Sequence, residues 1–119
     1  MNSDETELQE QLMEEHRRSP HPNLTGERLR LHVAIHSVVE IQVRDGVPPE
    51  TGATLRRLMD GGLDRHEAAH AIGTVVADEM FEIMSDRRKF SETQYAERLA
   101  ALTVESWRAR LAEMEKEPD

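Results

Sequence analysis

Cysteine is absent from the 119 residues of this chain. Its absence excludes disulfides, thiolate metal ligands and cysteine nucleophiles. Any metal ion must therefore be held by nitrogen and oxygen atoms. Aromatic residues are scarce as well, with one Trp, one Tyr and two Phe. A chain with so few stacking surfaces is a poor platform for single-stranded nucleic acid.

Excess basic charge and long apolar runs are also missing. The chain carries 15 basic and 24 acidic residues, for a formal net charge of −9. That balance disfavours binding to nucleic acid and to anionic membranes. No apolar run approaches the roughly 20 residues of a membrane span. The acidic start over residues 1–15 lacks the layout of a signal peptide. We therefore expect a cytoplasmic protein that binds neither nucleic acid nor membrane.

Proline and glycine clusters divide the chain into segments with helical periodicity. We predict a weak helix or an acidic arm over residues 1–20, then helices over 27–44, 50–59, 65–84 and 91–115. Thr25, Asp64 and Ser91 are the predicted helix caps, and Asp64 and Glu67 form a capping-box pattern. The fold class is therefore all-α: a single domain built as a four- or five-helix bundle.

Four of the six histidines form two pairs with i, i+4 spacing, His32 with His36 and His66 with His70. Such residues lie about 40° apart around a helix and about 6 Å along it, so two imidazoles can converge on one ion. Random placement would give roughly 0.25 such pairs. Both pairs fall in the two most apolar helices, where an unpaired polar ring is costly to bury. The pattern predicts a metal site between two helices, within a metal-binding domain over residues 21–119.

Two carboxylates extend these pairs. Glu40 lies one turn beyond His36 and is a candidate ligand or a partner that holds His36 in place. Glu67 is a capping residue in one interpretation and the catalytic general base in another. His16 and His21 are interpreted as surface residues. The predicted metal ligands are His32, His36, His66, His70 and Glu40.

This ligand set suits a divalent transition metal. Zinc and iron come first, with manganese and nickel as alternatives. Glu67 and His70 have the i, i+3 spacing of carboxylate-bridged di-iron bundles, but the spacing occurs once here and on two helices there. A mononuclear site is thus preferred to a dinuclear one.

The segment His66-Glu67-Ala68-Ala69-His70 is similar to the zinc-protease pattern His-Glu-x-x-His. In that pattern two histidines bind zinc and the glutamate activates a water molecule. The resemblance implies a small zinc-dependent hydrolase, with His32 or His36 as a third ligand. The absence of any predicted strand counts against a protease of this type, since such enzymes present substrate along a sheet edge.

A second resemblance covers about half of the chain. Its residues are His21-Pro22-Asn23-Leu24, 31–36, Glu40-Ile41-Gln42, Gly46-Val47-Pro48-Pro49, Leu55, Leu58 and 65–73. They resemble a bacterial family of uncharacterised small helical proteins, catalogued as a domain of unknown function. Its layout is Asn-Pro, Leu-His, Glu-x-Gln, Pro-Pro and His-x3-His. The first element departs from that layout, because His21-Pro22-Asn23 replaces Asn-Pro-x-x-His. The resemblance implies a shared site but no reaction.

Three functions are thus open at this point. The first is a metal-dependent enzyme, including the hydrolase above. The second is a non-enzymatic module that a closed metal site stabilises, and the third is a helical protein whose histidines only pack. The apolar stripe of Val104, Trp107, Leu111 and Met114 could pack internally or join two copies, so we also consider a homodimer through the C-terminal helix.

Overall fold

The computed structural model describes residues 26–116, and within that range the backbone forms five α-helices and no strand. They are α2 (Gly26–Asp45), α3 (Pro49–Asp60), α4 (Arg65–Asp86), α5 (Glu92–Ala101) and α6 (Val104–Lys116). The predicted all-α bundle is confirmed. The arm predicted over residues 1–20, the Thr25 cap, His16 and His21 lie outside the described residues. None of these five helices combines the length and apolar character needed to span a bilayer.

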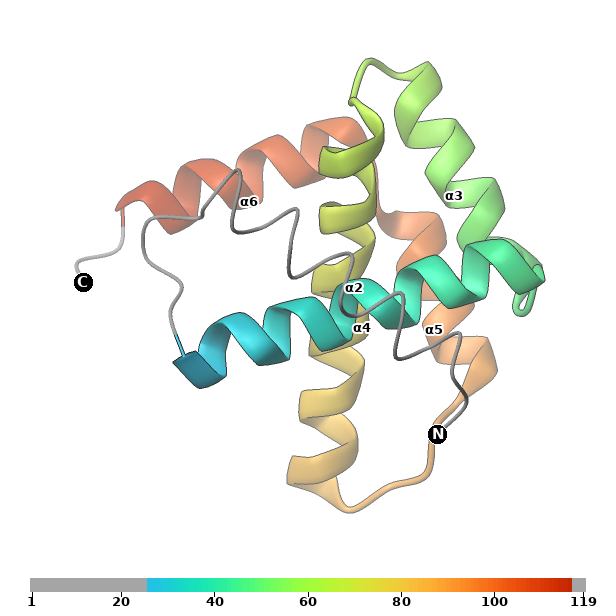
Figure 1. Cartoon of the computed structure of the whole chain (residues 1–119), viewed down its shortest axis with the longest axis vertical. Coiled ribbons are helices and arrows are strands. Elements are labelled where there is room, and N and C mark those ends of the chain that lie inside the picture. The colour runs from blue at the N-terminus through green and yellow to red at the C-terminus, as the bar shows by residue number, and fades with distance from the viewer. Residues whose placement is uncertain (1–25, 117–119) are drawn as a thin grey trace.

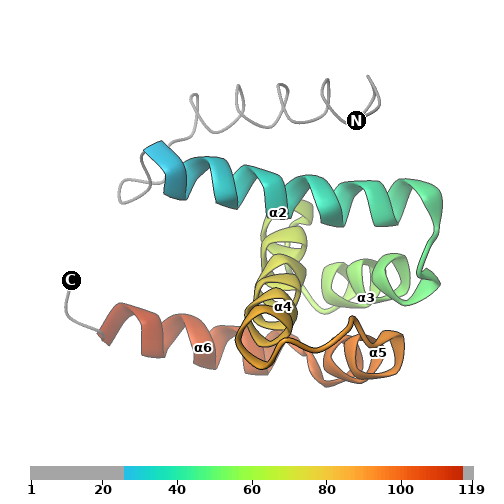
Figure 2. The same cartoon turned by 90° about the horizontal axis from the view of Figure 1, so that it is seen from below.

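Helix α4 lies at the centre of the bundle (Figures 1 and 2). Helix α2 crosses one side of it, and α5 and α6 lie on the opposite side, as Figure 2 shows. Helix α3 fills the flank beside α2, α4 and α5. All five helices contribute fully or nearly fully buried side chains to one core, among them Val39, Leu58, Ile72, Leu99 and Trp107.

Several helix ends are where the sequence predicts them. Gly46 ends α2 with a φ of 68°, and its N–H donates to Gln42 O at 2.9 Å. Asp64 caps α4 by accepting from Glu67 N at 2.8 Å, and Ser91 caps α5 by accepting from Gln94 N at 3.2 Å. These side chains satisfy backbone donors that the first helical turn leaves open.

The single helix predicted over residues 91–115 is wrong, because the chain breaks between α5 and α6. Thr103 and Ser106 form a reciprocal cap: Ser106 N donates to Thr103 Oγ1 and Thr103 N donates to Ser106 Oγ, each at 2.9 Å. Arg57 of α3 donates to the carbonyls of Leu99 and Leu102 at 2.9 and 2.7 Å. The reciprocal cap therefore stabilises the start of α6, and Arg57 stabilises the end of α5. The break needs neither proline nor glycine.

Gly73 lets α2 approach α4 closely. A Cβ atom at this position would lie 3.3 Å from Ile35 Cγ2 and 3.8 Å from His36 Cδ2. The absence of a side chain at Gly73 therefore permits this close approach. Helix α2 is less buried than its apolar composition predicts, since Leu31 is 56% exposed. Its interior face, however, carries His36 into the bundle.

Candidate metal centre

Three histidines from two helices share one centre. His32 and His36 come from α2 and His70 from α4, and one ring nitrogen of each lies within 4.8 Å of the other two. The ring centroids are 4.7 Å apart for His32 and His36, 4.6 Å for His32 and His70, and 5.3 Å for His36 and His70. His36 is only 3% exposed, and the other two rings are half-buried. The fold therefore gathers three of the four predicted histidine ligands.

Local structure explains this convergence. The i, i+4 spacing places His32 and His36 on one face of α2. That face meets α4 at Gly73, which lies three residues after His70. A Cβ atom at Gly73 would be within contact distance of the His36 ring. A side chain larger than hydrogen at that point would hold the α2 imidazoles farther from His70.

The arrangement suits a transition metal. Neutral imidazole nitrogen binds zinc at about 2.0–2.1 Å, so two such ligands in tetrahedral geometry lie roughly 3.3 Å apart. The nitrogens of His32, His36 and His70 all lie within 4.8 Å of one another, so modest side-chain rotations bring them to bonding positions. Three protein ligands leave the fourth tetrahedral position to a further side chain or to water.

His66 stands next to this group and outside it. Its side chain is exposed, and its ring centroid lies 5.4 Å from that of His36 and 6.1 Å from that of His70. The predicted role of His66 as a ligand therefore stays a prediction, with this residue as the nearest candidate for a fourth nitrogen.

Glu40 contacts Arg65 at the start of α4. Arg65 Nη1 donates to both carboxylate oxygens of Glu40, at 2.9 and 3.0 Å. This ion pair ties α2 to α4 about one turn from the histidines, and Glu40 is not a member of the three-histidine group. Its predicted ligation would require the carboxylate to leave Arg65.

Glu67 contacts the only tryptophan of the chain. Its Oε1 accepts from the indole Nε1 of Trp107 at 3.0 Å, and the Trp107 ring centroid lies 5.9 Å from that of His70. Within residues 26–116 this bond takes the place of the return bond to Asp64 that a full capping box predicts. Sequence reasoning missed the pairing, because no local spacing connects positions 67 and 107.

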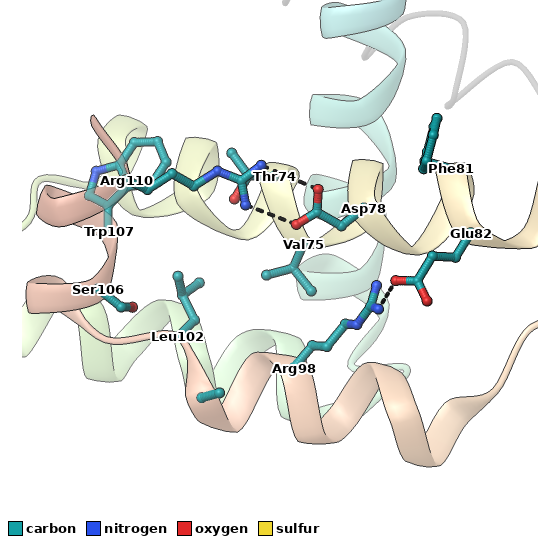
Figure 3. A pocket seen from close by; sticks show the side chains of 11 residues that line it. Thr74, Val75, Asp78, Phe81, Glu82, Arg98, Leu102, Ser106, Trp107 and Arg110 are labelled. Carbon is teal, nitrogen blue, oxygen red and sulfur yellow. Dashed lines mark hydrogen bonds and ion pairs between the residues drawn. The ribbon is translucent and has the colours of Figure 1, made fainter. Parts of the chain in front are cut away.

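A hollow of about 570 Å³ adjoins Trp107 on the side of α4 that faces α5 and α6 (Figure 3). Arg110 donates two hydrogen bonds to Asp78 across it, at 2.8 and 3.2 Å, and Arg98 pairs with Glu82. The hydrogen bond to Asp78 raises the pKa of Arg110. Asp78 is thus the salt-bridge partner that ties α4 to Arg110 of α6. Phe81 also lines the hollow, and its side chain is 70% exposed.

Fold and site together define a small all-α protein with a three-histidine cluster between two crossing helices. No family model, curated protein or solved structure matches the chain. The resemblance to the bacterial family of uncharacterised proteins and the homodimer through the C-terminal helix therefore both stay predictions.

Proposed function

We propose that this chain binds one divalent transition-metal ion through His32, His36 and His70. The observation that carries the proposal is the set of three imidazole nitrogens within 4.8 Å of one another, two from α2 and one from α4. Nitrogen donors suit zinc and iron first, with manganese and nickel as alternatives. The ion would bridge two helices that are distant in sequence, so binding it would stabilise the folded chain.

Charge favours neutral rings over protonated rings in this group, as metal binding requires. The three ring centroids lie between 4.6 and 5.3 Å apart. Two protonated imidazoles at about 5 Å would repel each other by about 3 kcal/mol at an effective dielectric constant of about 20. Rings so close are best accommodated in the neutral form, and that form binds metal ions.

Elemental analysis of protein purified without an affinity tag tests the proposal. We expect about one metal ion per chain, and zinc added to metal-free protein should bind at that stoichiometry in calorimetry. His36→Ala and His70→Ala should each remove the ion. Val39→Ala is the matched control: Val39 is fully buried on α2, three residues after His36, so its loss destabilises the fold without removing a nitrogen ligand. Unchanged metal content in both histidine variants would refute the assignment.

The hydrolase alternative rests on the open position that a three-ligand site would leave on the metal. In that alternative Glu67 is the general base. The bond from Trp107 to Glu67 would have to loosen, and the His-Glu-x-x-His pattern would also require His66 on the metal. A closed four-ligand site would instead make the ion a structural cross-link, as in a metal-stabilised interaction module.

Cobalt substitution separates these alternatives, because the electronic spectrum of Co²⁺ reports its ligands. If His66 completes a closed site, His66→Ala should change the spectrum strongly. If water holds the fourth position, the spectrum of His66→Ala should match that of the unaltered protein, and added small anions should change both. Only the second result would justify assays of hydrolysis with Glu67→Gln as the inactive control.

A further inference from the structure

A second, smaller hollow lies between α2, α4 and α5, farther along α2 and α4 than the histidines. Its volume is about 240 Å³, and its walls are largely apolar, with Val38, Val76, Ile83 and Phe90 among them. A mostly apolar hollow with a few polar atoms is the usual form of a small-molecule site.

One polar wall is Gln42, whose hydrogen bonds fix the direction of its amide. Gln42 Oε1 accepts from Thr51 Oγ1 at 2.7 Å and from Tyr95 OH at 2.8 Å. Burial raises the pKa of Tyr95, so its hydroxyl stays protonated and donates. With both lone pairs of Oε1 in use, the Nε2 group of Gln42 offers the donors on this side.

The other polar wall is Glu79, a carboxylate that is only 2% exposed. Its Oε2 accepts from Arg88 Nη2 at 2.7 Å. Its Oε1 lies 3.8 Å from Arg98 Nη1, and neither atom has a hydrogen-bond partner within residues 26–116. A buried polar atom without a partner costs on the order of 1–3 kcal/mol, and more for a charged group.

We propose that this hollow binds a small, uncharged, mainly apolar alcohol, independently of the metal centre. A hydroxyl group is one donor and two acceptors. It would donate to Glu79 Oε1 and accept from Gln42 Nε2, while the apolar body of the ligand would contact Val38, Val76 and Ile83. The ligand is uncharged because the two carboxylates nearby, Glu79 and Glu82, already face the two guanidinium groups of Arg88 and Arg98.

Benzyl alcohol and toluene form the matched pair of probes, since they share a ring and differ in the hydroxyl. Each is titrated into the full chain, with and without zinc, and backbone amide shifts are followed by NMR. We expect saturable shifts from benzyl alcohol near Val76, Ile83 and Tyr95, at least about tenfold tighter binding than toluene, and the same affinity with zinc. Equal affinities for the two probes, or no saturable shifts from benzyl alcohol, would overturn the proposal.

Two variants test the position of the site. Glu79→Gln removes the charge that the hydroxyl would face and should weaken benzyl alcohol binding about tenfold. Ile83→Phe fills the hollow and leaves its polar atoms in place, so it should abolish binding even if Glu79→Gln folds poorly. Unchanged affinity in Ile83→Phe would place the probe elsewhere and refute the site. Because neither variant touches a histidine, both should keep the metal content of the unaltered protein.

Discussion

The two halves of α4 bury polar side chains in different ways. In the second half, Glu79 is buried with opposite charges beside it, since Arg88 lies 2.7 Å and Arg98 3.8 Å from its carboxylate oxygens. In the first half, His70 is grouped with His32 and His36, and all three offer the same kind of atom. Opposite charges attract each other strongly where water is excluded, and this attraction offsets the cost of burying them. A group of like nitrogen donors is instead typical of a metal site, so the comparison separates a cluster of paired opposite charges from a candidate metal site.

The largest effect is expected from Glu79→Ala. It leaves two guanidinium groups without their buried carboxylate, and breaking a buried pair costs about 3 kcal/mol or more. Urea unfolding should show that loss, while elemental analysis shows unchanged metal content. Glu97→Ala is the control, because Glu97 is an exposed carboxylate on α5. An equal loss in both variants would contradict the structural role assigned to the second half of α4.

The effect of zinc on stability is the corresponding test of the histidine group on the first half of α4. At a free zinc concentration about 100 times Kd, binding adds about 2.7 kcal/mol to stability. A bound ion requires neutral imidazole and thus favours the deprotonated form in the folded state. The added stability is therefore present above the ordinary imidazole pKa of about 6.5 and is lost as the pH falls through it. Thermal unfolding with and without zinc from about pH 8 to about pH 5 measures this loss. Stabilisation retained at the acid end would indicate carboxylate ligands in place of histidine.

Gly73→Ala should weaken zinc binding about threefold to tenfold, with stability changed by less than about 1 kcal/mol. The new methyl group meets Ile35 Cγ2 at 3.3 Å and displaces α2 by a few tenths of an ångström, and the gain in helix propensity of about 1 kcal/mol offsets the strain. Gly52→Ala is the matched control, since its Cβ would meet only the Arg56 side chain at 3.5 Å. Calorimetric zinc affinities of the two variants decide the matter, and equal values would show that the α2–α4 distance does not limit binding.

The smallest effect is expected from Tyr95. Burial raises its pKa above the ordinary value of 10.0, with a further contribution from the charge of Glu79. A raised pKa means that the folded chain holds this proton more tightly than the unfolded one. The contribution to stability is present below about pH 10 and is lost as the pH rises beyond it. Tyr95 is the only tyrosine, so tyrosinate absorbance follows it directly. Titration at or below the ordinary pKa would contradict its burial, and Tyr95→Phe should remove this part of the alkaline loss.

Much of the fold was predictable because short-range signals end its helices. Gly46, Asp64 and Ser91 act within four residues of their own positions, and such interactions can be recognised in a sequence. The break before α6 was missed, although Thr103 and Ser106 carry a capping pattern, because the apolar stripe of 104–114 continues the periodicity across it. The hydrogen bonds from Arg57 to the carbonyls of Leu99 and Leu102 span more than forty positions, so no local sequence pattern predicts them.

The sequence indicates which histidines are candidate ligands, but it does not indicate which of them come together in one group. Helical spacing pairs His32 with His36 and His66 with His70, but the group of three depends on where α2 crosses α4. That crossing is set by contacts such as Gly73 against Ile35 and His36. The partners of the two carboxylates were not predicted either, since Glu40 contacts Arg65 and Glu67 contacts Trp107. Each partner comes from another helix, so sequence spacing alone does not reveal it.

The position of Trp107 allows its fluorescence to report on the histidine cluster. The chain has one indole, its ring centroid lies 5.9 Å from that of His70, and its N–H binds Glu67. Tryptophan fluorescence therefore comes from a single known place, next to the histidine cluster. Ions with unpaired electrons, such as Co²⁺ or Ni²⁺, quench a fluorophore this close, whereas closed-shell Zn²⁺ changes its emission only by altering its surroundings. If the proposed ion binds, Trp107 emission would report both its binding and its electronic character in dilute solution, without a label.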